Sequence, residues 1–193
     1  MNFLAHLLTS IGDEQVMVGN FIGDFVKGRH LDKYDAKIQT GIRVHRAIDH
    51  YTDHHPVVFE SKKRLRPNFR HYSPVIVDVF YDHFLAKAWK QYCNEDLYDF
   101  TIGFYAMMKK YEGQIPEAVN SMLMHMEAAN WLYNYQFLDG IDKALKGMAA
   151  RTRFESNMEI ATEELEKHYS AFENEFKVFF PDLLAFVKKN HER

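Results

Sequence analysis

The sequence has one cysteine, almost no strand signals and no long apolar run. Cys93 has no partner for an internal disulfide, so a reducing compartment, the cytoplasm, is expected. No apolar run is long enough to cross a bilayer, and the apolar start lacks the basic region of a signal peptide. Neither a membrane protein nor a disulfide-stapled secreted domain is therefore expected.

Several signatures of catalytic chemistry are also missing. The chain has no G-x-S-x-G nucleophile elbow and no Walker phosphate loop. A four-helix di-iron protein needs paired Glu-x-x-His motifs, and the nearest spacing here, Glu164 to His168, is one residue too long. The formal net charge of −3 argues against a general nucleic-acid coat, so no nucleic-acid partner is expected.

What is present is typical of one helical domain. A chain of 193 residues is long enough for one buried core and short for two. Helical periodicity recurs along the sequence, with no internal repeat or linker. We therefore expect an all-α, single-domain multi-helix bundle over residues 1–193. Helices are expected at 2–10, 14–28, 35–53, 57–65, 75–92, 97–111, 116–129 and 157–190, the last broken at Pro181.

The most informative stretch is GIRVHRAIDHYTDHHP, residues 41–56. His45, Asp49 and Asp53 recur at four-residue steps, so they share one face of a helix. Carboxylates and an imidazole that border a buried face are costly unless something compensates them. A divalent metal would do so, because carboxylate oxygens and neutral imidazole nitrogens are its ligands. A solvated polar face with incidental carboxylates is the other interpretation.

Three further segments carry residues of the same chemistry. His6 lies in the first expected helix, where a core histidine bonded to a backbone carbonyl is the simpler interpretation. Asp24 stands among apolar residues, so we expect it to be partly buried and either metal-bound or hydrogen-bonded to a neighbouring helix. Asp78 and Asp82 are four residues apart on an apolar helix, with His83 beside them. A salt bridge to Arg46 or another basic residue is the other interpretation for Asp78.

This set of residues favours a metal-dependent phosphohydrolase. Mixed nitrogen and oxygen donors without a thiolate cluster suit Mn, Fe or Mg better than a structural zinc. A metal-bound water is acidic enough to attack phosphorus. Arg46, next to His45, is a candidate to hold a phosphate oxygen, and a spare histidine such as His83 is a candidate to protonate the leaving oxygen. Which of His6, His45 and His83 is a ligand and which is the acid stays open.

The densest basic cluster follows directly after this stretch. It consists of Lys62, Lys63, Arg64, Arg66 and Arg70. Such a run is usually a solvated face, but in a protein of net negative charge it also suits docking of an acidic partner.

Five motifs, taken in order, carry a resemblance to a known family. NFLAHL, GNFIGDFVKG, GIRVHRAIDHYTDHHP, DVFYDHFLAKAW and GMAAR resemble the acyl carrier protein phosphodiesterases, a bacterial family also called ACP hydrolase. That family is described as all-helical, related to the HD phosphohydrolases and dependent on a divalent metal such as manganese. The resemblance implies an HD-phosphohydrolase-like fold and Mn²⁺ as cofactor, with Fe²⁺ or Mg²⁺ as alternatives. It also implies hydrolysis of the phosphodiester that joins 4′-phosphopantetheine to a serine of holo-acyl carrier protein, giving apo-acyl carrier protein and 4′-phosphopantetheine.

The resemblance also implies roles for individual residues. Asp24, His45, Asp49, Asp82 and His83 match the family motifs and are the expected metal and catalytic residues; His6 completes the candidate metal set. HD enzymes are named for a His-Asp dipeptide, which this chain lacks, so the assignment of individual ligands stays open. Acyl carrier protein is small and acidic, which suits the basic cluster as its docking surface. Two alternatives remain: a metal-dependent phosphohydrolase on a nucleotide or other small phosphoester, and a non-catalytic helical binding module. The oligomeric state stays open.

Overall fold

The computed structural model describes residues 1–28 and 30–191. Over this part the chain folds into helices and no strand, which confirms the all-α prediction. None of the described helices offers a stretch long and apolar enough to cross a bilayer. The helices are α1 Phe3–Leu8, α2 Glu14–Ile22, α3 Ala36–His54, α4 Pro56–Phe69, α5 Ser73–Lys87, α6 Leu97–Lys109, α7 Glu117–Ala128, α8 Trp131–Asn134, α9 Leu138–Ala149, α10 Ala161–Lys167 and α11 Tyr169–His191. Short 3₁₀ turns lie at Gly23–Phe25, His30–Lys33, Arg70–Tyr72, Trp89–Gln91 and Met158–Ile160.

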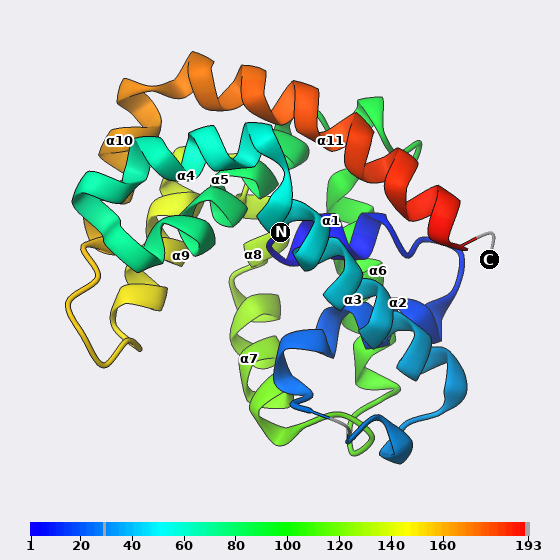
Figure 1. Cartoon of the computed structure of the whole chain (residues 1–193). Helices are drawn as coiled ribbons and strands as arrows, with labels where there is room; N and C mark the ends of the chain where they lie inside the picture. Colours follow the sequence, from blue (N-terminus) through cyan, green and yellow to red (C-terminus); the bar gives the residue numbers. More distant parts are fainter. Residues whose placement is uncertain (29, 192–193) are drawn as a thin grey trace.

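Helix α5 lies at the centre of the molecule. Its apolar side chains point in nearly every direction, and most of them are buried. Helices α1, α4, α9 and α11 pack around it (Figure 1). The long helix α11 runs over α3, α4 and α5, and it contributes Phe172, Phe176, Phe179, Phe180 and Leu183 to the core.

Helices α2 and α3 make the most extensive contact of any helix pair in the described chain. A Cβ on Gly41 would lie 2.1 Å from the carbonyl oxygen of Val16, and a Cβ on Gly19 would lie 2.0 Å from that of Ile38. Only glycine at both positions permits this approach of two helix backbones. The close approach places Asn20 of α2 directly beside His45 of α3.

Several expected helix bounds were wrong. The helix expected at 75–92 ends at Lys87, and the one expected at 57–65 runs on to Phe69. The helix expected at 14–28 ends at Ile22 and continues as a 3₁₀ turn, while Gly28 adopts the left-handed conformation six residues later. The helix expected at 157–190 is interrupted at His168 and runs through Pro181. Proline removes one backbone hydrogen bond, but Pro181 and Lys177 lie on the solvent face, where water satisfies the freed carbonyl.

Candidate metal and active site

Side chains from helices α1 and α3 form one compact cluster. Nε2 of His6 lies 3.2 Å from Oδ1 of Asp49, and Nε2 of His45 lies 3.0 Å from Oδ2 of the same carboxylate. The two imidazole rings stack with their centroids 4.0 Å apart. One ligand atom from each of these three residues lies within 4.8 Å of the others, and no other such group occurs in the described chain.

Asn20 fixes the orientation of both histidines. Its fully buried amide donates from Nδ2 to the His6 carbonyl at 2.7 Å and to Ser10 Oγ at 2.6 Å. Its Oδ1 therefore faces Nδ1 of His6, 2.8 Å away, so that nitrogen carries the proton. The Asn20 backbone carbonyl accepts from Nδ1–H of His45 at 2.7 Å. Sequence reasoning missed this role, because no local pattern reveals which histidines a buried asparagine will meet.

These tautomers make the cluster fit a cation. With Nδ1 protonated, each neutral imidazole presents the Nε2 lone pair to oxygen atoms that can only accept. For His6 these are Asp49 Oδ1 and, at 3.1 Å, the Met1 carbonyl. A nitrogen lone pair and a carboxylate oxygen repel each other unless a proton or a metal ion lies between them. Protons on Nε2 of both stacked rings would place two positive charges side by side, so a single cation is the better fit. Donors of this type, oriented by hydrogen bonds at Nδ1, suit Mn²⁺, Fe²⁺ or Zn²⁺.

The pKa values within the cluster follow from the same contacts. Burial opposes charge on His45, but Asp24 and Asp49 outweigh it and raise its pKa to about 9. Burial, reinforced by the neighbouring His45, lowers the pKa of His6 to about 4. Burial also opposes ionisation of Asp49, but the hydrogen bond from Nε2 of His45 and the positive charge of the nearby Met1 amino group hold the pKa of that carboxyl far below its usual range. In the metal-free cluster His45 is therefore protonated at neutral pH, while His6 stays neutral and keeps the lone pair on Nε2.

Asp24 joins the cluster from its solvent side. Its Oδ1 lies 3.1 Å from Nε2 of His45, and its side chain is 70% exposed, so the expected partial burial was wrong. The chain leaves the α-helix at Ile22, and the following 3₁₀ turn directs Asp24 outward. Gly23 makes this possible, because a Cβ there would lie 2.2 Å from Cγ of His45.

A second group of charges adjoins the cluster. The Met1 amino group lies 3.3 Å from Oδ1 of Asp49 and 3.3 Å from Oδ1 of Asp78. Burial opposes its charge, but Asp78 and Asp49 outweigh this effect and raise its pKa to about 10. Burial raises the pKa of the Asp78 carboxyl. Asp78 thus forms a salt bridge, but its partner is the Met1 amino group and not Arg46, which donates to the carbonyls of Val26 and Gly28.

The structure gives Asp82 and His83 partners of their own. Asp82 is fully buried and accepts from the backbone N–H groups of Leu4 at 2.7 Å and Ala5 at 3.1 Å, so it caps α1 from α5. Burial raises its pKa to about 7. His83 lies 2.7 Å from the Tyr135 carbonyl through Nδ1 and 2.9 Å from the Tyr169 hydroxyl through Nε2. Neither side chain makes a hydrogen bond to the four residues of the cluster.

Two other candidates on α3 have hydrogen-bond partners outside the cluster. Asp53 is exposed and accepts from Lys62 Nζ at 2.6 Å, so it does not share the site with His45 and Asp49. Arg46 is exposed beside the cluster and donates from Nη2 to the carbonyls of Val26 at 2.8 Å and Gly28 at 3.2 Å. Arg46 therefore holds the loop that follows Asp24.

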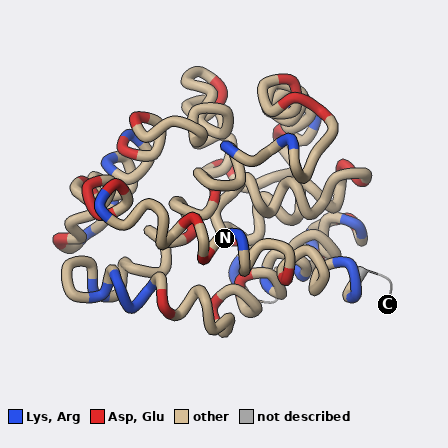
Figure 2. Tube along the Cα trace, turned by 90° about the horizontal axis from the view of Figure 1, so that it is seen from above, with Lys and Arg blue, Asp and Glu red and all other residues tan. Residues whose placement is uncertain are grey.

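The five basic residues of the predicted docking cluster are not equivalent. Arg64 makes two hydrogen bonds to Glu175 and stacks on Phe172, so it is part of the packing between α4 and α11. Lys62 is bound to Asp53. Arg66 and Arg70 are exposed and border a surface cavity of about 420 Å³. Lys and Arg gather along α4 at one edge of the molecule (Figure 2).

Fold and site together define an all-helical protein with a compact imidazole–carboxylate cluster at the meeting point of α1, α2 and α3. Comparison with known proteins places it in a family. A family model described as acyl carrier protein phosphodiesterase matches residues 1–183, and the chain belongs to this family.

Named relatives match over nearly their whole length. Acyl carrier protein phosphodiesterase of Enterobacter sp. (strain 638) is 32% identical over 97% of this chain and 98% of its own. The protein of that name from Pectobacterium atrosepticum is 31% identical over the same shares, and the one from Photorhabdus laumondii is 32% identical over 95% and 93%. No solved structure gives a significant match. The family confirms both the sequence resemblance and the predicted enzyme class, a phosphodiester hydrolase.

Proposed function

We propose that this protein hydrolyses the phosphodiester between 4′-phosphopantetheine and the serine of holo-acyl carrier protein, with a divalent metal as cofactor. The products are apo-acyl carrier protein and 4′-phosphopantetheine. Mn²⁺ is the proposed metal, with Fe²⁺ or Mg²⁺ as alternatives. The observation that carries the proposal is the cluster of His6, His45 and Asp49, whose ligand atoms lie within 4.8 Å of one another. The names of the relatives support acyl carrier protein as the substrate and a phosphodiester as the bond that is cleaved.

We assign the metal to His6, His45, Asp49 and Asp24. When bound, a divalent cation lowers the pKa of a water molecule and neutralises charge on a phosphoryl group. Asn20 keeps both Nε2 atoms directed inward, and Asp24 marks the side on which the substrate enters, because it alone of the four is largely exposed. Arg46, exposed next to His45, is the proposed contact to a phosphate oxygen.

In this proposal Asp82 and His83 do not contact the metal or the substrate but hold neighbouring elements in place. Asp82 anchors the N-terminus of α1 and thereby places His6. His83 joins α5 to the backbone of Tyr135 beyond α8. We therefore propose positioning roles for both, in place of the ligand and acid roles that the family motifs suggested.

The acidic substrate protein docks on α4 in this proposal. Arg66 and Arg70 supply the exposed charge at this face, together with Lys63, which lies 3.6 Å from Glu60. Complementary charge steers a partner toward its site and speeds association.

The reaction is tested by measuring the intact mass of holo-acyl carrier protein after incubation with the metal-stripped protein, with and without added Mn²⁺. We expect the phosphopantetheine mass to be lost only when Mn²⁺ is present. His45→Gln should abolish the loss, while His50→Gln, an exposed histidine on the same helix, should not.

Two results would contradict the proposal. If cleavage continues undiminished in the presence of a chelator, the reaction does not depend on a metal and that part of the proposal is wrong. An unchanged holo mass with Mn²⁺ demonstrably bound would remove the substrate and favour a nucleotide or another small phosphoester.

A further inference from the structure

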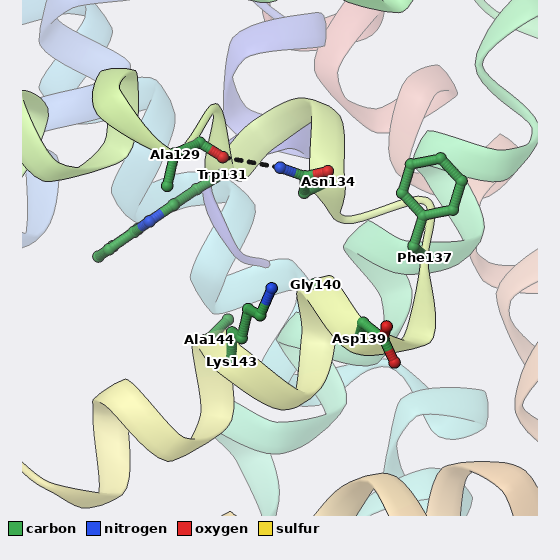
Figure 3. Close-up of a pocket in the computed structure, with 8 residues that line it drawn as sticks. All are labelled: Ala129, Trp131, Asn134, Phe137, Asp139, Gly140, Lys143 and Ala144. Carbon is green, nitrogen blue, oxygen red and sulfur yellow. Dashed lines mark hydrogen bonds between the residues drawn. The ribbon is translucent and has the colours of Figure 1, made fainter.

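A hollow between α8 and α9 is unused by the site described above. It has a volume of about 410 Å³, within the roughly 300–1,000 Å³ of small-molecule sites. Trp131 and Phe137 stand on opposite sides of it, and Lys143 lies between them (Figure 3). Half-buried Trp131 offers an aromatic face, and exposed Lys143 offers three hydrogen-bond donors.

Asn134 adds an acceptor to this hollow. Its Nδ2 donates to the Ala129 carbonyl at 2.7 Å, which fixes the amide and leaves Oδ1 for a ligand (Figure 3). The lining thus combines aromatic surface, an amide oxygen, the Lys143 cation and the Asp139 carboxylate. A chain of amide groups and short apolar segments matches these features, because amide carbonyls accept from lysine, amide N–H groups donate to Oδ1 and methyl groups pack on the aromatic rings.

The hollow is joined to the cluster by a short series of contacts. Tyr135 directly follows Asn134, and its hydroxyl accepts from Asn2 Nδ2 at 3.1 Å. The neighbouring residue, Met1, places its amino group 3.3 Å from Asp49. Figure 1 shows α8 beside the first residues of the chain near the centre of the molecule. The segment that carries the hollow thus lies next to the first residues of the chain, which border the cluster.

We infer that the hollow between α8 and α9 binds the pantetheine arm of the substrate, an inference that rests on the proposed function. The arm is an extended chain with two amides, a hydroxyl and a geminal dimethyl group. It is attached to the phosphate that the cluster must reach. Trp131 packs on the chain, Lys143 binds an amide carbonyl or the hydroxyl, and Asn134 accepts from an amide N–H.

The first test uses pantetheine itself, without phosphate, on the metal-free protein. Trp131 fluorescence should change saturably as pantetheine is added, and Lys143→Ala should raise the dissociation constant about tenfold, as expected for one hydrogen bond to a charged group. Lys146→Ala is the matched control. Lys146 is exposed on the same helix, bonded to Asp142, and outside the hollow. Binding should be unchanged in this variant.

The second test is kinetic. Trp131→Ala should raise the KM for holo-acyl carrier protein while the affinity for Mn²⁺ stays unchanged. Cleavage of holo-acyl carrier protein without any effect of pantetheine on Trp131 would overturn this inference and leave the proposed function standing. An equal loss of pantetheine binding in the Lys143 and Lys146 variants would also overturn it. Saturable, Lys143-dependent binding without cleavage would support the subsite and contradict the proposed reaction.

Discussion

At the scale of single residues, the geometry of the site depends on Asn20. One side-chain amide orients His6, and the backbone carbonyl of the same residue orients His45. Hydrogen bonds of this kind at Nδ1 commonly support metal-binding histidines, and their removal weakens metal binding by roughly 10- to 100-fold. Asn20 is thus a positioning residue that needs no contact with the substrate.

Replacing Asn20 should separate stability from metal affinity. We expect Asn20→Ala to weaken Mn²⁺ binding by roughly 10- to 100-fold and to destabilise the metal-free protein, because buried polar groups lose their partners. Ser10→Ala is the control. It removes the hydrogen bond from Asn20 Nδ2 to Ser10 Oγ and the one from Ser10 Oγ to the His6 carbonyl, but it removes no contact to either imidazole. That variant should lose stability and keep its Mn²⁺ affinity. Titration calorimetry and urea unfolding measure the two quantities, and equal metal affinity in both variants would contradict the role of Asn20.

His83 should contribute a pH-dependent part of the stability. Burial lowers its pKa from 6.5 to about 4 in the folded protein. Between these values the unfolded chain binds the extra proton, so the free energy of unfolding rises with pH and the contribution is complete above about 6.5. It is lost as the pH falls toward 4 and amounts to on the order of 3 kcal/mol.

Urea unfolding of the metal-free protein at pH 4.5 and pH 7 measures this contribution. The difference between the two pH values should be smaller in His83→Gln than in the unmodified protein, since the other titrating groups are common to both. Equal differences in the two proteins would show that His83 titrates alike in the folded and unfolded chains.

At the scale of helices, the spacing of residues along the chain predicted part of the site. His45 and Asp49 share a helix face because they are four residues apart, and both meet at the cluster. The same rule placed Asp53 on that face, but Lys62, which lies in the next helix, draws it away. Periodicity gives the face of a helix and not the partners that other helices bring to it.

The segments beyond α3 show the limit of prediction more clearly. The direction of Asp24 depends on the residue at which α2 ends, and helix ends are weakly encoded. Asp82 looks like a ligand in the sequence because a buried carboxylate needs compensation, and its partners are backbone groups 77 and 78 residues away. His83 likewise finds its acceptor in Tyr135, 52 residues along the chain. Such long-range pairings follow from packing, which local pattern does not specify.

The exposed charges of α4 should control association with the substrate protein. Arg66→Glu should raise the KM for holo-acyl carrier protein by about five- to tenfold at low salt, with kcat nearly unchanged, because the charge acts on encounter rather than on chemistry. Lys188→Glu makes the same change of net charge near the far end of α11 and should have little effect. Steady-state kinetics at two salt concentrations decide the matter. An equal rise in KM for both variants would assign the effect to net charge alone.

At the scale of the whole molecule, the fold brings distant segments to one place. The close α2–α3 packing places Asn20 against His45, and α5 caps α1 so that His6 reaches Asp49. The cluster then lies beside the first residues of the chain, which also contact α8. The proposed metal site thus lies where α1, α2 and α3 meet, the proposed site of the substrate arm lies between α8 and α9, and the proposed docking face lies on α4. The metal site is central, because the other two proposals assume that the phosphate is cleaved there.

The most direct measurement of this central claim is an Mn²⁺ titration followed by electron paramagnetic resonance, in which bound and free Mn²⁺ are distinguished. We expect His45→Gln to abolish specific binding, while His83→Gln and His50→Gln should bind Mn²⁺ as the unmodified protein does. Loss of binding in His83→Gln with binding retained in His45→Gln would move the metal from the meeting point of α1, α2 and α3 to α5, and would contradict the account.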